Sequence, residues 1–278
     1  MICRICDSSN IYIIKWGSTN LIHCRDCDIH YLAEFPSFDK LNNYYEKEYK
    51  IQKDGGYTEF RRVSRLNEQY ELIKIIRQYK QIGSILDIGC DKGYFLDEAR
   101  RMGIDVAGVE LSESARQYCH NVGLDVRRSI DDFDKKFDAV IMNHSLEHFT
   151  NPRKIISEIQ HKLNDKGLLI LRVPAFDSVW SRLMKHYWIW FQPQNHYFHF
   201  SKKSLKLLVE IFNFRILSIR YRKPNNKITR KFTALARTSF SNNTDYSPTL
   251  RNRIGYIVES IAGVELFLIA QKQDNSNK

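Results

Sequence analysis

Four of the six cysteines stand in two closely spaced pairs near the start of the chain. Cys3 and Cys6 form one Cys-x-x-Cys pair, Cys24 and Cys27 form the other, and 17 residues separate them. Each turn directs two thiolates to a common point, and two turns supply the four sulfur ligands that zinc prefers. Four protein ligands leave no open position for a reactant, so we predict a structural zinc site. Reduced pairs or disulfides are the alternatives, and disulfides are rare in the cytosol.

The segment that holds these cysteines, residues 1–35, is too short to bury a core of its own. Metal binding would therefore supply its folding free energy. His23 and His30 flank the second pair and could act as ligands, but four thiolates complete the set without them. Cys90 and Cys119 stand alone later in the chain, and we expect both to be small buried residues.

A second group of chemically useful residues follows the apolar run at residues 84–88. Gly89 and Gly93 would let the backbone approach a ligand closely, and the helix expected after them offers free N–H groups. A dinucleotide fingerprint would need glycines at the positions of Asp91 and Tyr94. The Asp91 carboxylate would meet the pyrophosphate, so NAD and FAD are disfavoured.

An acidic residue follows at the spacing that a nucleoside requires. Glu110 stands 23 residues after Asp87, at the end of the next expected strand. A carboxylate there can accept hydrogen bonds from both hydroxyls of an adenosine ribose. The order of strand, glycine-containing turn, helix, strand and acid predicts a nucleoside site. A glycine turn beside an unrelated surface acid is the alternative.

Alternating strands and helices must position these residues. Such repetition predicts a mostly parallel sheet covered on both faces, whose ligands bind outside the carboxyl ends of the strands. Residues 66–77 predict a lead-in helix, residues 202–212 a later helix, and residues 214–221 and 264–271 two final strands. Between them the apolar pattern predicts strands at 84–88, 106–110, 125–128, 139–143 and 168–173, with helices at 93–102, 112–122 and 152–163.

Residues 85–96, Ile-Leu-Asp-Ile-Gly-Cys-Asp-Lys-Gly-Tyr-Phe-Leu, resemble the first motif of class I S-adenosylmethionine-dependent methyltransferases. Residues 137–149 are similar to their fourth-strand motif, in the Leu-Glu-His form of the ubiquinone-biosynthesis methyltransferases. Residues 167–174 and 196–201 resemble later motifs of that branch, whose members often carry an N-terminal cysteine ribbon and modify sugars or other small molecules. The chain departs from the family at Asp91, where glycine is usual.

The resemblance implies an α/β fold with a Rossmann-like, doubly wound sheet behind a small zinc ribbon, and S-adenosylmethionine as the cofactor. It divides the chain into the ribbon at 1–35, a linker and lead-in helix at 36–80, and the methyltransferase domain at 81–278. It also implies roles for single residues: Asp87, Gly89 and Gly93 would hold the methionine part, Glu110 the ribose, Ser129, Ile130 and Asp131 the adenine edge, and Asn143 and His144 the sulfonium end.

An alcohol or phenol acceptor must lose a proton when it is methylated, and a histidine suits the role of general base. We predict His196, which lies in an aromatic-rich stretch expected to cover the acceptor; a backbone hydrogen bond within a loop is its alternative role. His144 is the alternative base, and His148 is expected to be structural. The dense acids at residues 131–134 read as a solvated face, so we expect no catalytic metal.

The net charge of +11 is concentrated in the last quarter of the chain. Residues 201–278 contain 15 basic and 5 acidic residues, whereas residues 1–200 contain 28 and 27. Residues 222–262 would form a basic insertion beside the acceptor pocket, where it would contact a phosphate or another polyanion. A solvated face is the alternative, and residues 250–262 could instead touch a membrane surface or a second subunit.

The resemblance, together with the basic segment, implies O-methylation of a sugar, nucleotide-sugar or surface-glycan acceptor, in polysaccharide biosynthesis. A quinone or phenolic acceptor is the first alternative, and an RNA-binding protein, an RNA methyltransferase or a non-catalytic binding protein are the others. Nucleic acid is disfavoured because Asn-His-Ser-Leu, not a base-holding motif, follows the fourth strand. The N-terminus lacks a signal pattern and no apolar stretch could span a bilayer, so we expect a soluble, cytoplasmic protein. The oligomeric state has no sequence signal.

Overall fold

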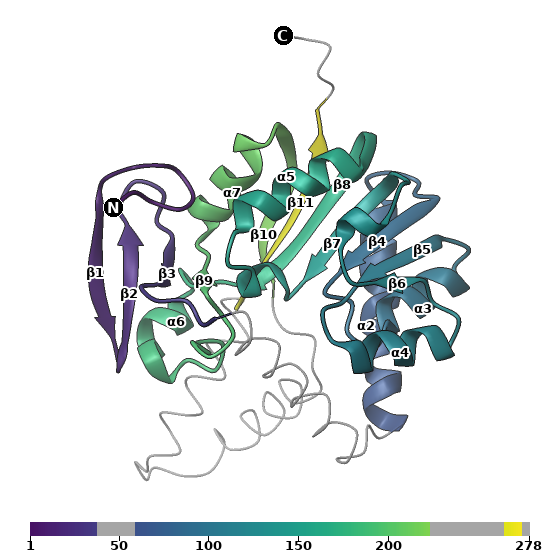
Figure 1. Ribbon diagram of the computed structural model, residues 1–278, viewed down its shortest axis with the longest axis horizontal. Coiled ribbons are helices and arrows are strands. Elements are labelled where there is room, and N and C mark those ends of the chain that lie inside the picture. Colours follow the sequence, from purple (N-terminus) through teal and green to yellow (C-terminus); the bar gives the residue numbers. More distant parts are fainter. Residues whose placement is uncertain (38–58, 223–263, 274–278) are drawn as a thin grey trace, which may run out of the picture.

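The computed structural model describes residues 1–37, 59–222 and 264–273. A seven-stranded sheet runs through its centre, with helices on both faces (Figure 1). Five neighbouring strands are parallel, and two strands at one edge run antiparallel to their neighbours. In spatial order the strands are β6 (Val126–Arg127), β5 (Asp105–Val109), β4 (Ser84–Ile88), β7 (Phe137–Asn143), β8 (Leu163–Pro174), β11 (Glu265–Lys272) and β10 (Phe214–Arg222).

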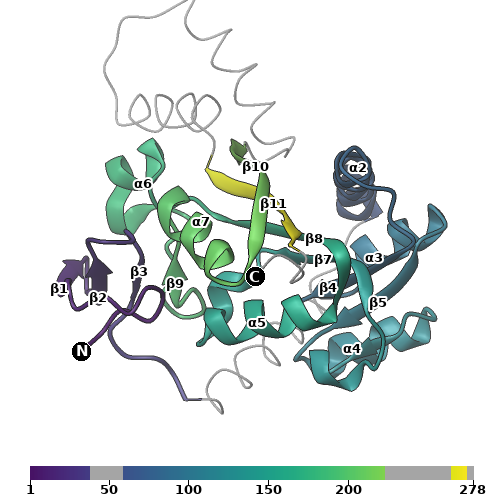
Figure 2. The same cartoon turned by 90° about the horizontal axis from the view of Figure 1, so that it is seen from above.

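Alternation along the strands builds a core on each face of the sheet. Leu86 and Ile88 of β4 belong to one apolar cluster, and Ile85 of the same strand belongs to the other. The helices follow this division (Figure 2), which confirms the doubly wound α/β sheet predicted from the sequence. Helices α2 (Glu59–Arg77), α3 (Tyr94–Arg101) and α4 (Glu113–Asn121) cover the face of Ile85, and α5 (Pro152–Lys162) and α7 (Lys202–Ile211) cover the other.

Polar residues at the helix starts fix the turns that leave the strands. The Ser112 hydroxyl accepts the Ala115 N–H at the start of α4. Asn151 caps α5 in the same way, with Pro152 in the first helical position. Ser201 and Ser204 cap each other at the start of α7. Each cap therefore defines the residue at which the turn ends and the helix begins.

Strand order reverses direction at β4. The chain passes from β4 outward to β5 and β6 and then returns to the other side of β4 as β7 and β8. At such a reversal the turns after two neighbouring strands diverge and leave a crevice, the usual ligand site of open α/β sheets. Strand β11 runs antiparallel to β8 with Glu265 opposite Pro174, so its first residue lies at this same edge.

The N-terminal cysteine segment forms part of a second, smaller sheet. Strands β1 (Ile11–Trp16), β2 (Thr19–Cys24) and β3 (His30–Leu32) are antiparallel, and β9 (Phe198–His199) is paired to β3. In Figure 1 this sheet lies beside the short helix α6 (Val179–Met184). The ribbon side chains join the apolar cluster of the α5 and α7 face.

The predicted elements are confirmed, with shifts at their ends. Strand β4 matches its prediction residue for residue, and the lead-in helix is present as α2. Strand β8 begins at Leu163, five residues before its predicted start, although Lys166 within it has a left-handed φ of 56°. The predicted insertion at 222–262, except Arg222 at the end of β10, and the predicted helix at 250–262 lie outside the described residues, as do residues 38–58 of the predicted linker.

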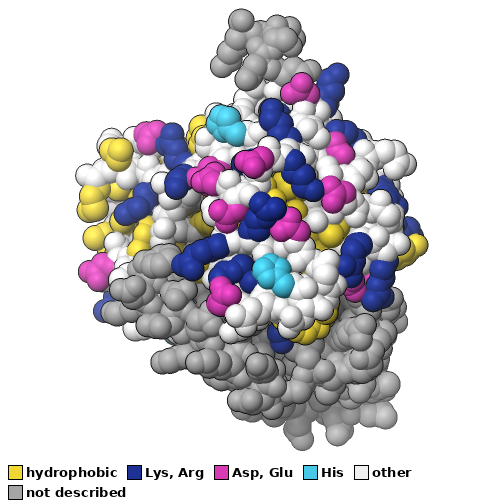
Figure 3. Space-filling model, turned by 45° about the vertical axis from the view of Figure 1, so that its right-hand side comes forward, with side chains coloured by type: hydrophobic (Ala, Val, Ile, Leu, Met, Phe, Trp, Pro, Cys, Tyr) yellow, Lys and Arg dark blue, Asp and Glu magenta, His cyan; other side chains and the backbone are white. Residues whose placement is uncertain are grey.

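Charges are mixed on the face that carries the β5–β6 edge. Figure 3 shows basic and acidic side chains interspersed there, in keeping with the near balance of charge in residues 1–200. Among the described helices, none is both long and apolar enough to cross a membrane.

Candidate active site

Two turns at the carboxyl edge pack directly against each other. Gly89 follows β4 with a φ of 79°, and a Cβ there would lie 2.6 Å from Cβ of Ser145 in the turn after β7. The Ser145 hydroxyl donates a hydrogen bond of 2.6 Å to the Ile88 carbonyl. A side chain at position 89 would therefore separate the two turns, which explains the glycine. Gly93 precedes α3 with a φ of 69°, and a Cβ there would meet Leu124 at 2.5 Å.

Asp87 is a buried carboxyl group at the end of β4. Its Oδ1 has no hydrogen-bond partner among the residues that the structure describes. Burial, together with the nearby carboxylates of Glu110 and Asp91, raises the pKa of Asp87 to about 8. A buried carboxyl group without a partner, surrounded by other acids, is a site that favours a cationic ligand.

Glu110 follows β5, and its carboxylate accepts two backbone hydrogen bonds. The Asp91 N–H donates to Oε2 at 3.0 Å and the Ser112 N–H donates to Oε1 at 2.9 Å. Burial raises the pKa of Glu110, and these two hydrogen bonds oppose that shift. The carboxylate therefore joins the glycine turn after β4 to the turn after β5.

A cavity of about 480 Å³ opens at the reversal of strand order. Its walls come from α2, from the turns after β4 and β7, from the ends of β8 and β11, and from the segment after α6. The lining residues are Glu68, Gln69, Asp87, Gly89, Cys90, Asp91, Tyr94, Phe95, Asn143, His144, Arg172, Trp190 and Glu265.

His144 forms one wall of this cavity in an unusual backbone conformation. Its φ is 55°, in the left-handed region that side chains rarely adopt, and such residues cluster at functional sites. Its ring stacks on Trp190 with centroids 4.9 Å apart and planes at 9°. Nδ1 is buried 3.6 Å from a carboxylate oxygen of Glu147, and Nε2 lies 3.2 Å from one of Glu265. Burial lowers the pKa of His144, but the two carboxylates outweigh it and raise the pKa overall.

Glu265 and Arg172 form a buried ion pair beside His144. Nε of Arg172 donates to Oε2 of Glu265 at 2.7 Å, and Nη1 donates to Glu68 of α2 at 2.6 Å. Burial alone would raise the pKa of Glu265, but His144 and Arg172 lower it to about 2. The carboxyl group of Glu265 is therefore held in its ionised form near neutral pH, where it contacts both His144 and Arg172 at the cavity.

His196, the predicted base, lies behind this wall and does not line the cavity. Its Nδ1 is 2.8 Å from the Trp190 carbonyl oxygen, and its ring meets His148 edge to face at 4.8 Å. Burial lowers the pKa of His196 to about 4. The side chain of His196 is thus hydrogen-bonded to backbone within the loop, the alternative role given to it above. It is in contact with Trp190, which lines the cavity.

The structure brings some predicted site residues together and leaves others apart. Asp87, Gly89, Asn143 and His144 line one cavity. Gly93 and Glu110 support the adjoining turns. The predicted adenine edge forms a short 3-10 turn after β6, in which Ser129 accepts a hydrogen bond from the Asp131 N–H and Ile130 is buried. None of the residues 129–131 lines the cavity.

Sequence reasoning did not assign Glu68, Arg172 or Glu265 to the site. Arg172 interrupts the apolar run of β8, and Glu265 stands beside the apolar run of β11. A charged residue in a strand that is otherwise buried needs a partner, so each of the two charges could have indicated a buried ion pair. Which residue is the partner could be predicted only from the strand order, in which β11 lies next to β8.

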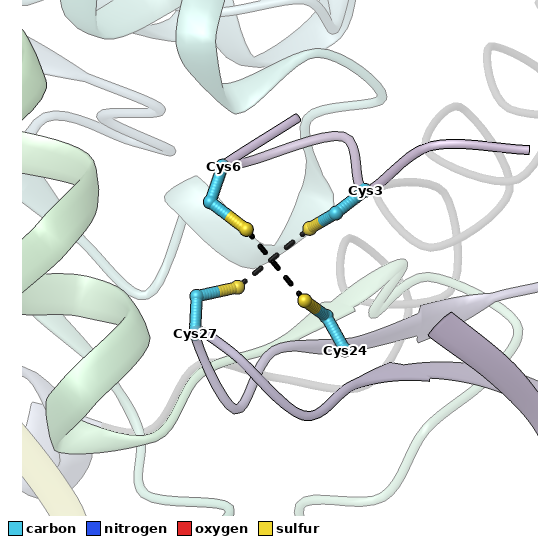
Figure 4. A group of neighbouring side chains, drawn as sticks. All are labelled: Cys3, Cys6, Cys24 and Cys27. Atoms are coloured by element: carbon cyan, nitrogen blue, oxygen red, sulfur yellow. Dashed lines mark hydrogen bonds between the residues drawn. The ribbon is translucent and has the colours of Figure 1, made fainter. Parts of the chain in front are cut away.

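The four paired cysteines converge on one point (Figure 4). Sγ of Cys3 is 3.6 Å from that of Cys27, and Sγ of Cys6 is 3.6 Å from that of Cys24. A tetrahedral zinc ion with metal–sulfur bonds of about 2.3 Å has sulfur–sulfur separations of about 3.8 Å. All four are free thiols with ligand atoms within 4.8 Å of one another, so the cluster could hold a zinc ion.

The two histidines of the ribbon contact each other and not the thiol cluster. Their rings stack at 3.9 Å, and His23 Nε2 lies 3.1 Å from Asp28. Cys90 and Cys119 are both buried, which confirms that expectation.

The chain matches a known protein family over most of the sheet and the cavity. A family model described as a methyltransferase domain matches residues 52–219, more than half of the chain. The chain belongs to this methyltransferase domain family. The match includes the glycine turn, the turn after β7 and most of β10.

Individual relatives of this chain are distant. Ubiquinone biosynthesis O-methyltransferase from Rickettsia bellii is 25% identical over 149 residues, which are 50% of this chain and 60% of the relative. The chain spans about half the length of the curated relatives it matches. A SAM dependent methyltransferase from Archaeoglobus fulgidus has a TM-score of 0.52 at 20% identity, covering 73% of this chain and 92% of that one. The plantazolicin methyltransferase BpumL, solved with SAH, has 0.53 at 17%, covering 84% and 94%. These likenesses show the fold.

The cavity residues fit S-adenosylmethionine, which carries a sulfonium and an ammonium group. Oδ1 of Asp87 and Oδ1 of Asn143 are buried acceptors without a partner in the described residues. Asp91 and Glu265 add negative charge to the same walls. Gly89 leaves the backbone bare at the turn after β4. Hydrogen-bond acceptors and carboxylates suit a cationic ligand. S-adenosylmethionine has no phosphate group that these carboxylates would repel.

Replacing Cys27 with serine should release the metal from the ribbon. We expect one zinc ion per chain in the purified wild-type protein and much less in Cys27→Ser, because an alcohol is a far weaker zinc ligand than a thiolate. Metal analysis by plasma mass spectrometry measures this. Cys119→Ser, a buried cysteine outside the cluster, is the matched control and should keep its zinc. Equal metal content in both variants would contradict the assignment.

Binding of S-adenosylhomocysteine should depend on the protonation of Asp87. Its pKa of about 8 means that the free carboxyl group is mostly protonated at pH 7. A cationic amino group favours the ionised form, so binding should release a proton, and affinity should rise with pH up to about 8 and then level off.

Calorimetry in buffers of different ionisation enthalpy measures this proton release. Asp87→Asn should bind more weakly and release no proton, while Asp134→Asn, on an exposed residue, should behave like wild type. Affinity that falls between pH 6 and 8 in the wild type would contradict the role of Asp87.

Proposed function

We propose that the chain is an S-adenosylmethionine-dependent methyltransferase that methylates a hydroxyl group of a sugar-like acceptor. The observation that carries this proposal is a single polar cavity that joins the carboxyl groups after β4 to His144 and Trp190. Family membership supports the reaction class. The acceptor is inferred from the chemistry of the walls.

The cofactor half of the cavity would be built by residues after β4, β5 and β7. S-adenosylmethionine would supply a methyl group on a positively charged sulfur. Asp87 and Gly89 would bind the methionine part, with Gly93 supporting their turn, and Glu110 would bind the ribose if it exchanges part of its backbone hydrogen bonding. Asn143 would lie near the sulfonium end, and residues 129–131 at the adenine edge remain a prediction.

His144 is the group best placed to take the proton of the acceptor. It lines the cavity, whereas His196 does not. Nδ1 faces the buried carboxylate of Glu147, which fixes the ring, and Nε2 lies next to Glu265. A proton accepted at Nε2 would produce an imidazolium between two carboxylates, which stabilise it. We propose His144 as the base and His196 as the residue that holds the Trp190 backbone.

The acceptor half of the cavity suits a hydroxylated ring better than an apolar tail. Trp190 offers an aromatic face, and Glu68, Arg172 and Glu265 surround it with hydrogen-bonding groups. A quinone or phenol remains the second candidate, because curated relatives are named ubiquinone biosynthesis O-methyltransferases. Its ring would fit the same stacking face.

We propose that Arg222, which does not itself line the cavity, would meet an anionic group of the acceptor that extends past its wall. Its Nη1 is buried without a hydrogen-bond partner among the described residues, and its backbone is opposite Glu265 in the β10–β11 pairing. Burial and the neighbouring Arg172 both lower the pKa of Arg222, and a phosphate would relieve this repulsion. A nucleotide-sugar therefore fits this edge, as do a lipid-linked sugar or a charged glycan, and surface-polysaccharide biosynthesis in the cytoplasm would supply such acceptors.

Methyl transfer to defined acceptors tests the proposal. With S-adenosylmethionine, mass spectrometry should detect a methylated nucleotide-sugar from a panel of nucleoside diphosphate hexoses and none from a catechol. Turnover should rise with pH through the pKa of His144, which lies above its ordinary value, because the base must be unprotonated to act. Methylation of the catechol alone would replace the sugar by the phenolic alternative.

The two candidate bases are separated by matched variants. His144→Gln should lower turnover by about 10²-fold or more while leaving S-adenosylhomocysteine affinity nearly unchanged. His196→Gln should cost less, since it acts through the position of Trp190. Full turnover in His144→Gln, with loss in His196→Gln, would return the base to His196.

A further inference from the structure

The ribbon, residues 1–35, shares a sheet with the segment that forms the proposed acceptor side of the cavity. We call residues 185–200 the wall segment. His30 pairs with His199 and Tyr31 with Phe198, and the Leu32 N–H donates to the Tyr197 carbonyl at 3.0 Å. The end of the wall segment is thus a strand of the ribbon sheet.

The hairpin between β1 and β2 supports the other end of the wall segment. Trp16 packs on Phe176 with ring centroids 5.0 Å apart and on Phe191 at 6.3 Å. Gly17 follows with a φ of 63°, and a Cβ there would lie only 2.8 Å from Cβ of His186. The tip of the hairpin therefore abuts the wall segment with no space between them.

Aromatic side chains hold this stretch among the described residues. Tyr187 is 74% exposed and Ile189 is 70% exposed, whereas Trp188 and Phe191 are buried in the apolar core and Trp190 is partly buried against it. Phe191 is one of the side chains on which Trp16 packs. Loss of Trp16 would remove part of a small set of anchors, and a cavity left there would let the stretch shift.

The wall segment sets the position of the Trp190 ring over His144. The backbone carbonyl of Trp190 is held by His196, and the Tyr197 N–H donates to the Glu147 carbonyl at 2.8 Å. The backbone of Trp190 is therefore held by His196, and the next residue, Tyr197, is hydrogen-bonded to the turn after β7. Both residues belong to the wall segment, which the ribbon supports. The stacking of Trp190 on His144 places the ribbon one step from the proposed base.

We infer that Trp16 is a positioning residue, which acts through Phe191 to hold Trp190 against His144. The ribbon would then have a role in acceptor binding beyond its own folding. This inference rests on the proposed function only in treating His144 as the base. The stacking of Trp190 on His144 can be measured without turnover.

Proton NMR of histidine-labelled protein measures the stacking directly. An aromatic ring stacked on His144 shifts the imidazole protons upfield, and Trp190→Leu provides the spectrum without that shift. The His144 signals are identified by their loss in His144→Gln. In Trp16→Ala we expect these protons to move at least halfway to their position in Trp190→Leu, while the Kd of S-adenosylhomocysteine changes by less than about twofold.

Two further variants keep the test specific. Ile13→Ala removes a side chain of the same strand that is 59% exposed and should leave the His144 signals unchanged. Trp16→Phe keeps an aromatic ring on Phe176 and Phe191 and should restore the wild-type shift. The inference is overturned if the His144 protons in Trp16→Ala coincide with those of wild type, or if Ile13→Ala moves them equally. A wild-type protein that shows the shift but transfers no methyl group would instead count against the proposed function alone.

Discussion

The proposed acceptor side of the site depends on the contacts that the buried carboxylate of Glu265 makes with Arg172 and His144. It lies at the carboxyl edge of the sheet only because β11 runs antiparallel to β8 and begins where the parallel strands end. There it accepts a hydrogen bond from Arg172 and lies 3.2 Å from His144. A buried charge without partners would cost several kcal/mol, so these three side chains constrain one another. Arg172 extends the constraint to Glu68 of α2.

The same edge separates two kinds of chemistry within one cavity. Toward β4 and β5 the groups are carboxylates and bare backbone, which suit a cationic ligand. Toward β8 and β11 they are a paired arginine, a histidine between two carboxylates and a stacked tryptophan, which suit a hydroxylated ring. The β3–β9 pairing ties this second half to the cysteine ribbon, so the ribbon and the wall segment are parts of one structure.

Local sequence patterns were sufficient for the strands, the helices and the glycine turn, because each depends on residues close in the chain. The run at 84–88 and the glycines after it predicted β4 and its turn directly. Contacts between distant segments could not be predicted in this way. Pairing of Glu265 with Arg172 depends on strand order, and the position of His196 behind Trp190 depends on how residues 185–200 fold over the sheet. An aromatic-rich stretch predicted a wall, but not which residue of it faces the cavity.

The central claim is that Asp87, Gly89 and Asn143, which are proposed to hold the cofactor, share one cavity with His144. Titration of the isotope-labelled protein with S-adenosylhomocysteine, followed at the imidazole signals, tests it most directly. His144 should shift in proportion to occupancy, because it lines the same cavity as Asp87, while His161, on the exposed side of α5, should not. Saturation of the protein with S-adenosylhomocysteine that leaves the His144 signals in place would contradict the account.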